Sequence, residues 1–124
     1  MLTLILLPDE MVVARLPADA ALPDWALAAS FVSITRTPDE LSILCPASHA
    51  PDDIQAERGW RCLQVAGPLD FSLVGVLASL LGPLQEAGVS VFALSTYDTD
   101  YLLVKNTQLS RALKALRAAG HHIP

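Results

Sequence analysis

The sequence has 124 residues and a mass of 13.2 kDa, enough for one compact domain or for two very small ones that share a core. Hydrophobic residues make up 52% of it and charged residues 17%, which excludes a disordered chain. The formal net charge is -5, which argues against nucleic acid as the main partner, because proteins that neutralise phosphates carry a basic face.

The first half of the chain predicts two hairpins, at residues 2–16 and 31–45. Each consists of an apolar run of strand length, a Pro-Asp-Glu turn and a second apolar run. Proline presets the backbone angle that such a turn needs, and aspartate caps it. In the second hairpin Ser33 and Thr35 alternate with apolar residues, which indicates a sheet with one buried face. Between the hairpins, residues 23–27 predict one or two helical turns.

The second half of the chain predicts the order strand, helix, strand, strand, helix. Leucines that recur every three or four residues indicate a helix that begins at Asp70 or Ser72 and ends before Gly88. The strands are expected at residues 60–66, 89–94 and 101–104, and the last helix between Asn106 and Gly120.

A polar connector at residues 50–59 separates two predicted subdomains, 1–59 and 60–124. A last strand supplied by the first subdomain completes a βαββαβ unit in the second. That arrangement is an α+β fold of the ferredoxin-like kind, with an antiparallel sheet and two helices. Units this small depend on each other's apolar faces for stability, so we expect two tandem, closely packed subdomains.

The residue types that carry catalysis or bind metals show no recognisable pattern. His49, His121 and His122 belong to no motif and are most simply solvated side chains. Cys45 and Cys62 lie at no metal-ligand spacing and are expected to be buried thiols in a reducing compartment. The glycines form neither a phosphate loop nor a dinucleotide fingerprint. We therefore predict no catalytic residue, no metal, no cofactor and no enzyme activity.

The signals of export and of membrane insertion are also missing from the sequence. Its apolar runs are shorter than the roughly 18 residues that span a bilayer. Residues 1–7 have no basic segment and lead directly into Pro8, which makes a poor signal peptide. The expected location is the cytoplasm, with no membrane and no nucleic acid as partner.

Two polar segments predict a binding site for a small molecule. Residues 67–72 join a strand to the predicted helix, where free N–H groups and the helix dipole favour a carboxylate. Residues 95–101 carry hydroxyls, carboxylates and phenols, so the two segments together suit both charged groups of an amino acid. A polar turn without a ligand remains the alternative. Asp98 and Asp100 as an acid–base pair have less support, because nothing else in the sequence supplies a reaction.

Three segments also carry a resemblance to a known family. They are Gly-Pro-Leu-Asp-Phe-Ser at 67–72, the run at 84–101 that contains Ser-Thr-Tyr-Asp-Thr-Asp-Tyr, and residues 31–44. Together they resemble the ACT domain, and more narrowly the small tandem-ACT proteins related to the arginine sensors of TOR signalling, the CASTOR-type branch. The resemblance extends over nearly the whole chain, and the Ser-Thr-Tyr-Asp-Thr-Asp-Tyr run is its specific part.

This resemblance implies a regulatory role, because ACT domains bind amino acids or similar effectors at interfaces between ACT units and alter an attached or partner protein. The implied ligand-binding residues are Thr96, Tyr97, Asp100, Leu69, Asp70, Phe71, Ser72, Ser33 and Ile34. Asp100 is expected to face a cationic group, with the loop before the helix opposite it and the last two residues on a facing strand. The eukaryotic sensors carry more ACT units, so a homodimer or an ACT-containing partner would restore their arrangement.

The leading hypothesis is a non-catalytic regulatory module that binds an amino acid at an interface between ACT units. The alternative is a protein-interaction or dimerisation module with no small-molecule ligand. An enzyme on the same scaffold is a third hypothesis, for which the sequence offers no nucleophile and base. The sequence leaves open which amino acid is bound, the downstream partner and the oligomeric state, because no local spacing encodes the shape of a pocket.

Overall fold

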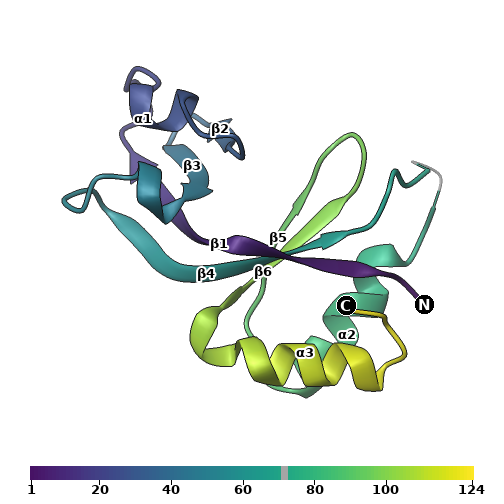
Figure 1. Ribbon diagram of the computed structural model, residues 1–124. Helices are drawn as coiled ribbons and strands as arrows, with labels where there is room; N and C mark the ends of the chain where they lie inside the picture. Colours follow the sequence, from purple (N-terminus) through teal and green to yellow (C-terminus); the bar gives the residue numbers. More distant parts are fainter. Residues whose placement is uncertain (71–72) are drawn as a thin grey trace. The chain divides into compact units, whose positions relative to one another are not determined.

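The computed structural model describes residues 1–70 and 73–124 (Figure 1). Its elements are β1 (Leu4–Leu16), α1 (Asp24–Leu27), β2 (Ser33–Arg36), β3 (Leu41–Pro46), η1 (Ala47–His49), β4 (Ala56–Val65), α2 (Val76–Glu86), β5 (Phe92–Ser95), β6 (Asp100–Lys105), η2 (Asn106–Gln108) and α3 (Leu109–Ala118). The strands form a six-stranded sheet in the order β2-β3-β1-β4-β6-β5. The pairs β1–β3, β2–β3 and β5–β6 are antiparallel. The α+β class predicted from the sequence is confirmed.

The chain divides into two compact units, one made of Met1–Pro8 with Arg61–Pro124 and the other of Asp9–Trp60. The sequence predicted the segments 1–59 and 60–124, whereas contacts in the structure group the first eight residues with the second half. The interpretation of the two units as tandem ACT-like subdomains stays a prediction.

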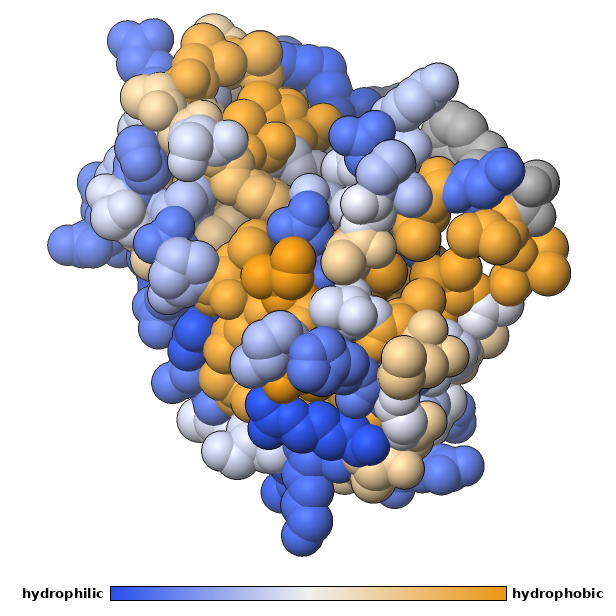
Figure 2. All heavy atoms as spheres, turned by 45° about the vertical axis from the view of Figure 1, so that its right-hand side comes forward, coloured by the Kyte–Doolittle hydropathy of each residue, from blue (hydrophilic) through white to orange (hydrophobic). Residues whose placement is uncertain are grey.

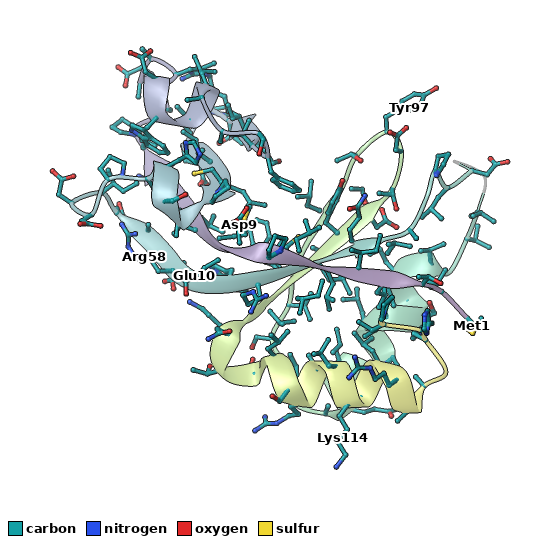
Figure 3. The ribbon with its side chains drawn as sticks, in the orientation of Figure 1. Met1, Asp9, Glu10, Arg58, Tyr97 and Lys114 are labelled. Carbon is teal, nitrogen blue, oxygen red and sulfur yellow. The ribbon has the colours of Figure 1, made fainter. Side chains whose placement is uncertain are left out.

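The turn predicted at Pro8-Asp9-Glu10 is wrong, because β1 is one continuous strand. Figure 3 shows Asp9 and Glu10 along this strand. The backbone angle of proline is compatible with an extended chain, and proline removes only one hydrogen-bond donor. Pairing overrides the local turn signal, since β1 lies between β3 and β4 in the sheet.

The second predicted hairpin is confirmed, and it lies in the Asp9–Trp60 unit. β2 pairs with β3 up to the register Arg36↔Leu41. The turn is closed by the Thr37 N–H, which donates to the backbone oxygen of Glu40 at 2.9 Å. Side chains from β1, α1 and β3 form the buried core of this unit: Val12, Ala14, Ala26, Leu41, Ile43, Cys45 and Ala50.

The other unit has the predicted order of β4, α2, β5, β6 and α3. Figure 1 shows α2 and α3 on the same face of its strands. Residues 1–8 supply the additional strand, since the Ala66 N–H donates to the backbone oxygen of Thr3 at 2.8 Å. The core between sheet and helices consists of Leu4, Leu63, Val65, Leu80, Leu84, Val89, Leu102, Val104, Ala112, Leu116 and Ile123. In the described part of the chain, no helix has the length and apolar character needed to cross a membrane.

Helix α2 begins later than the sequence predicted. It starts at Val76, directly after Gly75, which has a left-handed φ of 78°. Leu73, predicted to be in the helical stripe, precedes the helix and is 53% exposed. The proposed cap Ser72 lies outside the described residues, and the backbone oxygen of Asp70 accepts the Leu73 N–H at 3.0 Å. The predicted helix end is confirmed, because Gly88 follows the C-cap with a positive φ.

The prediction that His121 is solvated is wrong, because its side chain is buried. Its Nδ1 accepts a hydrogen bond from the Leu2 N–H at 3.2 Å, and its Nε2 lies 3.1 Å from the backbone oxygen of Ser79. The next residue, His122, forms a parallel bridge with Thr3. The end of the chain is thus attached to its beginning, a long-range contact that local sequence does not report. The two cysteines are free and buried, as predicted.

Candidate functional site

A cavity of about 170 Å³ lies within the unit that contains residues 61–124. It is lined by Leu69, Asp70, Leu73, Val76, Ser95, Thr96, Tyr97, Asp98, Thr99 and Asp100. The lining residues come from the segment between β4 and α2, from the first residue of α2, and from the β5–β6 hairpin. Both polar segments that the sequence singled out therefore contribute to one cavity.

The hairpin has a tight, polar end because its own side chains close it. Ser95 and Asp100 are the last paired residues of the two strands, and the Ser95 hydroxyl donates to Asp100 Oδ1 at 2.5 Å. The Thr96 N–H donates to the backbone oxygen of Thr99 at 2.8 Å. Figure 3 shows Tyr97 at the tip, and its side chain is 81% exposed. The turn thus leaves the Asp100 carboxylate in the cavity wall, with one of its oxygens bonded to a hydroxyl.

Thr99 fastens the hairpin to the segment that follows β4. Its hydroxyl donates to the backbone oxygen of Val65 at 2.6 Å, and the residue is only 4% exposed. The backbone oxygen of the neighbouring Asp98 accepts a hydrogen bond from the Leu69 N–H at 2.7 Å. Gly67 permits this approach, because a Cβ built on it would lie 3.1 Å from the Cβ of Thr99. These contacts hold two segments far apart in sequence at the distance that leaves the cavity between them.

The cavity is lined by both acidic and apolar side chains. Asp70, Asp98 and Asp100 contribute carboxylates, and none of the described lining residues is a lysine, arginine or histidine. Leu69, Leu73 and Val76 contribute the apolar part of the wall. Figure 2 shows hydrophobic side chains gathered on the surface at the right-hand edge of the view. The arrangement suits a small molecule that carries both a cationic and an apolar part.

The electrostatic effect of these groups extends to the neighbouring Tyr101. Burial raises the pKa of its phenol above the usual value, and the charges of Cys62 and Asp98 raise it further. Tyr101 therefore stays protonated at neutral pH, and it is not among the described residues that line the cavity.

The structure brings together five of the nine residues predicted for the site: Leu69, Asp70, Thr96, Tyr97 and Asp100. Phe71 and Ser72 lie outside the described residues. Ser33 and Ile34 are on β2 in the Asp9–Trp60 unit, where they pair with Leu44 and Ile43. The place of these last four residues in the site stays a prediction.

Five lining residues are not among the nine named from the sequence: Leu73, Val76, Ser95, Asp98 and Thr99. The last three belong to the polar segment 95–101 that the sequence did single out. The sequence predicted a longer helix that contains Leu73 and Val76, so neither was expected to line a cavity. Asp98 was named by itself only as part of an acid–base pair, although the polar segment 95–101 includes it. Nothing in the local sequence marks Thr99 as buried, since its partner is the backbone of a distant residue.

Comparison with known proteins identifies this arrangement. The model of the ACT domain matches residues 55–118, which run from β4 to the end of α3 and include all of the described residues that line the cavity. The chain belongs to the ACT-domain family. A second family model, described as an N-terminal domain, matches residues 9–53 of this ACT protein.

Two relatives of this ACT protein carry the same name. The Bos taurus protein named cytosolic arginine sensor for mTORC1 subunit 1 is 31% identical over 97 residues, covering 69% of this chain and 30% of the relative. The Homo sapiens protein of the same name is 32% identical over 59 residues, covering 47% of this chain and 18% of the relative. The chain thus spans less than a third of the length of these sensors. The resemblance to their branch of the ACT family is confirmed.

Solved structures extend the comparison to the whole ACT chain. A crystal structure of a protein from Agobacterium tumefaciens has a TM-score of 0.93 and 40% identity, and covers 99% of this chain and 92% of that one. The regulatory subunit of aspartate kinase from Thermus thermophilus has a TM-score of 0.63 at 13% identity, with coverage of 94% and 96%. The second likeness concerns the fold alone, and it confirms the ferredoxin-like ACT architecture.

Proposed function

We propose that this chain is a non-catalytic regulatory ACT module that binds an amino acid or a similar small effector. The observation that carries the proposal is the convergence of Leu69, Asp70, Thr96, Tyr97 and Asp100 on one cavity. They come from two segments of the chain, at residues 69–70 and 96–100, which the sequence alone does not place side by side.

The chemistry of the cavity supports a ligand with an ammonium or other cationic group. The Asp100 carboxylate faces this group, and the hydroxyls and backbone of the Thr96–Thr99 turn add polar contacts. Leu69, on the opposite side, contacts the apolar part of the ligand. No step of bond making or breaking is assigned to these residues.

The relatives support a regulatory role of this kind. One is named an arginine sensor, and a protein of similar fold is the regulatory subunit of aspartate kinase. In line with the cytosolic sensors, we place the module in the cytoplasm. We expect it to act as a homodimer or with an ACT-containing partner, because it spans only part of the length of the sensors.

A thermal-shift screen of the full chain against the twenty amino acids tests the proposal. A ligand present at 100 times its dissociation constant adds about 2.7 kcal/mol to the free energy of unfolding, a shift of several degrees. The response is expected to be selective and to be lost in Asp100→Asn. The matched control is Asp52→Asn, an exposed aspartate of the other unit, which keeps the response. A flat screen at millimolar concentrations contradicts the proposal.

The alternative function is a protein-interaction module without a small-molecule ligand. It is favoured by exposed hydrophobic side chains at and beside the cavity, Val74 at 91% and Tyr97 at 81%. Exposed hydrophobic surface of this kind is typical of interaction sites. Gel filtration of the wild type and of Val74→Ser with Tyr97→Ser distinguishes the two, because only an interface built on these residues changes the apparent mass.

A further inference from the structure

We propose that the Asp9–Trp60 unit carries a second small-molecule site, which binds a molecule with one carboxylate and one ammonium group. The site is a cavity of about 220 Å³, the Arg15 groove, whose described lining residues all belong to this unit. None of them is among the nine residues predicted for the first site. The second site therefore goes beyond the proposed function and does not depend on it.

The polar side chains of the Arg15 groove come from neighbouring strands of the sheet. Ser42 on β3 pairs with Arg15 on β1, and on the other side the Arg15 N–H donates to the backbone oxygen of Gln55 at 2.9 Å. Alternate residues of a strand point to opposite faces of its sheet. Since Ala14 and Ile43 point into the buried core of this unit, Arg15 and Ser42 lie on the opposite face.

Arg15 is held at the edge of the groove without being neutralised. Its guanidinium donates to the backbone oxygen of Asp39 at 3.0 Å. The turn that contains Asp39 is itself fixed, because its N–H donates to Thr37 Oγ1 at 3.1 Å. In the described part of the chain, Arg15 forms no ion pair. A guanidinium has five N–H donors in a planar fork, so the remaining donors of Arg15 suit a carboxylate.

Glu40 supplies the opposite charge to the same groove. The residue is half-buried, and within residues 1–70 and 73–124 its carboxylate forms no hydrogen bond or ion pair. The other acidic lining residue, Glu57, already interacts with another group and is not assigned to the ligand. A cation and a carboxylate thus line one groove without bonding to each other. A ligand with both charged groups neutralises both, whereas a simple anion or cation leaves one of them without a partner.

The rest of the groove favours a small ligand with a short apolar part. The Ser42 hydroxyl and the Gln55 amide line it, and among the described residues neither side chain is engaged in a hydrogen bond. Both are therefore available to the polar ends of a ligand. Val13 and Ala56 contribute apolar lining. A zwitterion with a short hydrocarbon side chain, such as valine, matches this set of groups.

A titration of the ¹⁵N-labelled full chain with three matched compounds, followed by NMR, tests the second site. L-valine has both charged groups, L-valinamide keeps the ammonium without the carboxylate, and isovalerate keeps the carboxylate without the ammonium. We expect valine to shift the backbone N–H signals of Arg15, Ser42 and Gln55 and to bind at least ~10-fold more tightly than either analogue, about 1.4 kcal/mol. An analogue that binds as tightly as valine, or no shift of these three signals, overturns the second site.

Two variants of the groove test its charged groups one at a time. Arg15→Gln and Glu40→Gln should each weaken valine binding at least ~10-fold. The matched controls are Arg111→Gln and Asp52→Asn, which remove an exposed charge of each sign outside the groove and should keep the affinity. The spectrum without ligand reports whether each variant keeps its fold. Unchanged binding in both groove variants, or equal weakening in the controls, contradicts the assignment.

The variant Asp100→Asn distinguishes the Arg15 groove from the first cavity, which Asp100 lines. Valine should still shift the signals of Arg15, Ser42 and Gln55 in this variant. If these shifts disappear, the groove is not a separate site, while the proposed function stands. A first cavity that binds no ligand contradicts the proposed function alone and leaves the shifts at the groove as expected.

Discussion

The hydroxyl of Thr99 donates a 2.6 Å hydrogen bond to the backbone oxygen of Val65, a residue 34 positions earlier in the chain. This bond joins the tip of the β5–β6 hairpin to the end of β4. With the bond from the Leu69 N–H to the backbone oxygen of Asp98, it sets the separation of the two cavity walls. The cavity therefore depends on the bond between Thr99 and Val65. Neither of these two residues was predicted to bind the ligand.

Replacement of Thr99 by valine is expected to lower the free energy of unfolding by about 1–2 kcal/mol, because the buried acceptor loses its partner while the volume is conserved. Urea denaturation measures the change. Thr107→Val, at an exposed threonine of η2, is the control and should change stability by less than about 0.5 kcal/mol. Equal losses in both variants would show that the Thr99 bond contributes nothing specific.

Substitution of Gly67 by alanine should prevent the close approach of the β5–β6 hairpin to the segment that follows β4. The new Cβ would lie 3.1 Å from the Cβ of Thr99 and 3.2 Å from the backbone oxygen of Asp98, so one segment has to move. We expect a loss of about 1–3 kcal/mol, as for other overpacked sites. The control is Gly82→Ala in α2, where nothing lies within 4 Å of the added Cβ. That variant should gain about 0.5–1 kcal/mol, because alanine favours a helix over glycine.

His121→Leu should destabilise the protein by about 1–3 kcal/mol, since the Leu2 N–H and the Ser79 oxygen both lose their partner at a buried position. Glutamine offers an acceptor and a donor on one side chain, so His121→Gln should recover part of the loss. The exposed neighbour provides the control, His122→Leu. Thermal or urea unfolding of the three variants gives the comparison, and a leucine variant as stable as the wild type would rule out a role for the two bonds.

Burial of the thiols predicts a stability change at alkaline pH. Burial raises the pKa of Cys62 from 9.0 to about 12, and the pKa of Cys45 rises for the same reason. Between these values the unfolded chain has lost the Cys62 proton and the folded chain has kept it. The contribution of the Cys62 thiol to the free energy of unfolding is therefore fully present below pH 9 and is lost as the pH rises towards 12.

Reaction with a thiol reagent tests the burial of the two cysteines at lower pH. At pH 8 both cysteines should react slowly in the folded protein and rapidly in denaturant, because only the thiolate is the nucleophile. Rapid modification of the folded chain at pH 8 would contradict the burial of Cys45 and Cys62.

Local periodicity was sufficient to predict most of the elements. The alternation in β2 and β3 and the leucine spacing of α2 depend on residues a few positions apart, so the local sequence is enough to predict these elements. The same holds for the polar hairpin, since Ser95 and Asp100 belong to one short turn. Local signals marked the two polar segments, and the resemblance to the ACT family supplied the nine individual residues, of which five line the cavity.

The sequence by itself thus determined the α+β class, the order of elements in the second half and the residue types offered for binding. Only the tertiary structure decided that β1 runs straight through Pro8, that His121 is buried, and that Thr99 reaches Val65. Each of these depends on pairing between residues far apart in the chain, whose free energy outweighs a local turn or terminus preference of about 1 kcal/mol. The cavity is a product of such pairing, because its two walls meet only when β4 and β6 lie side by side in the sheet.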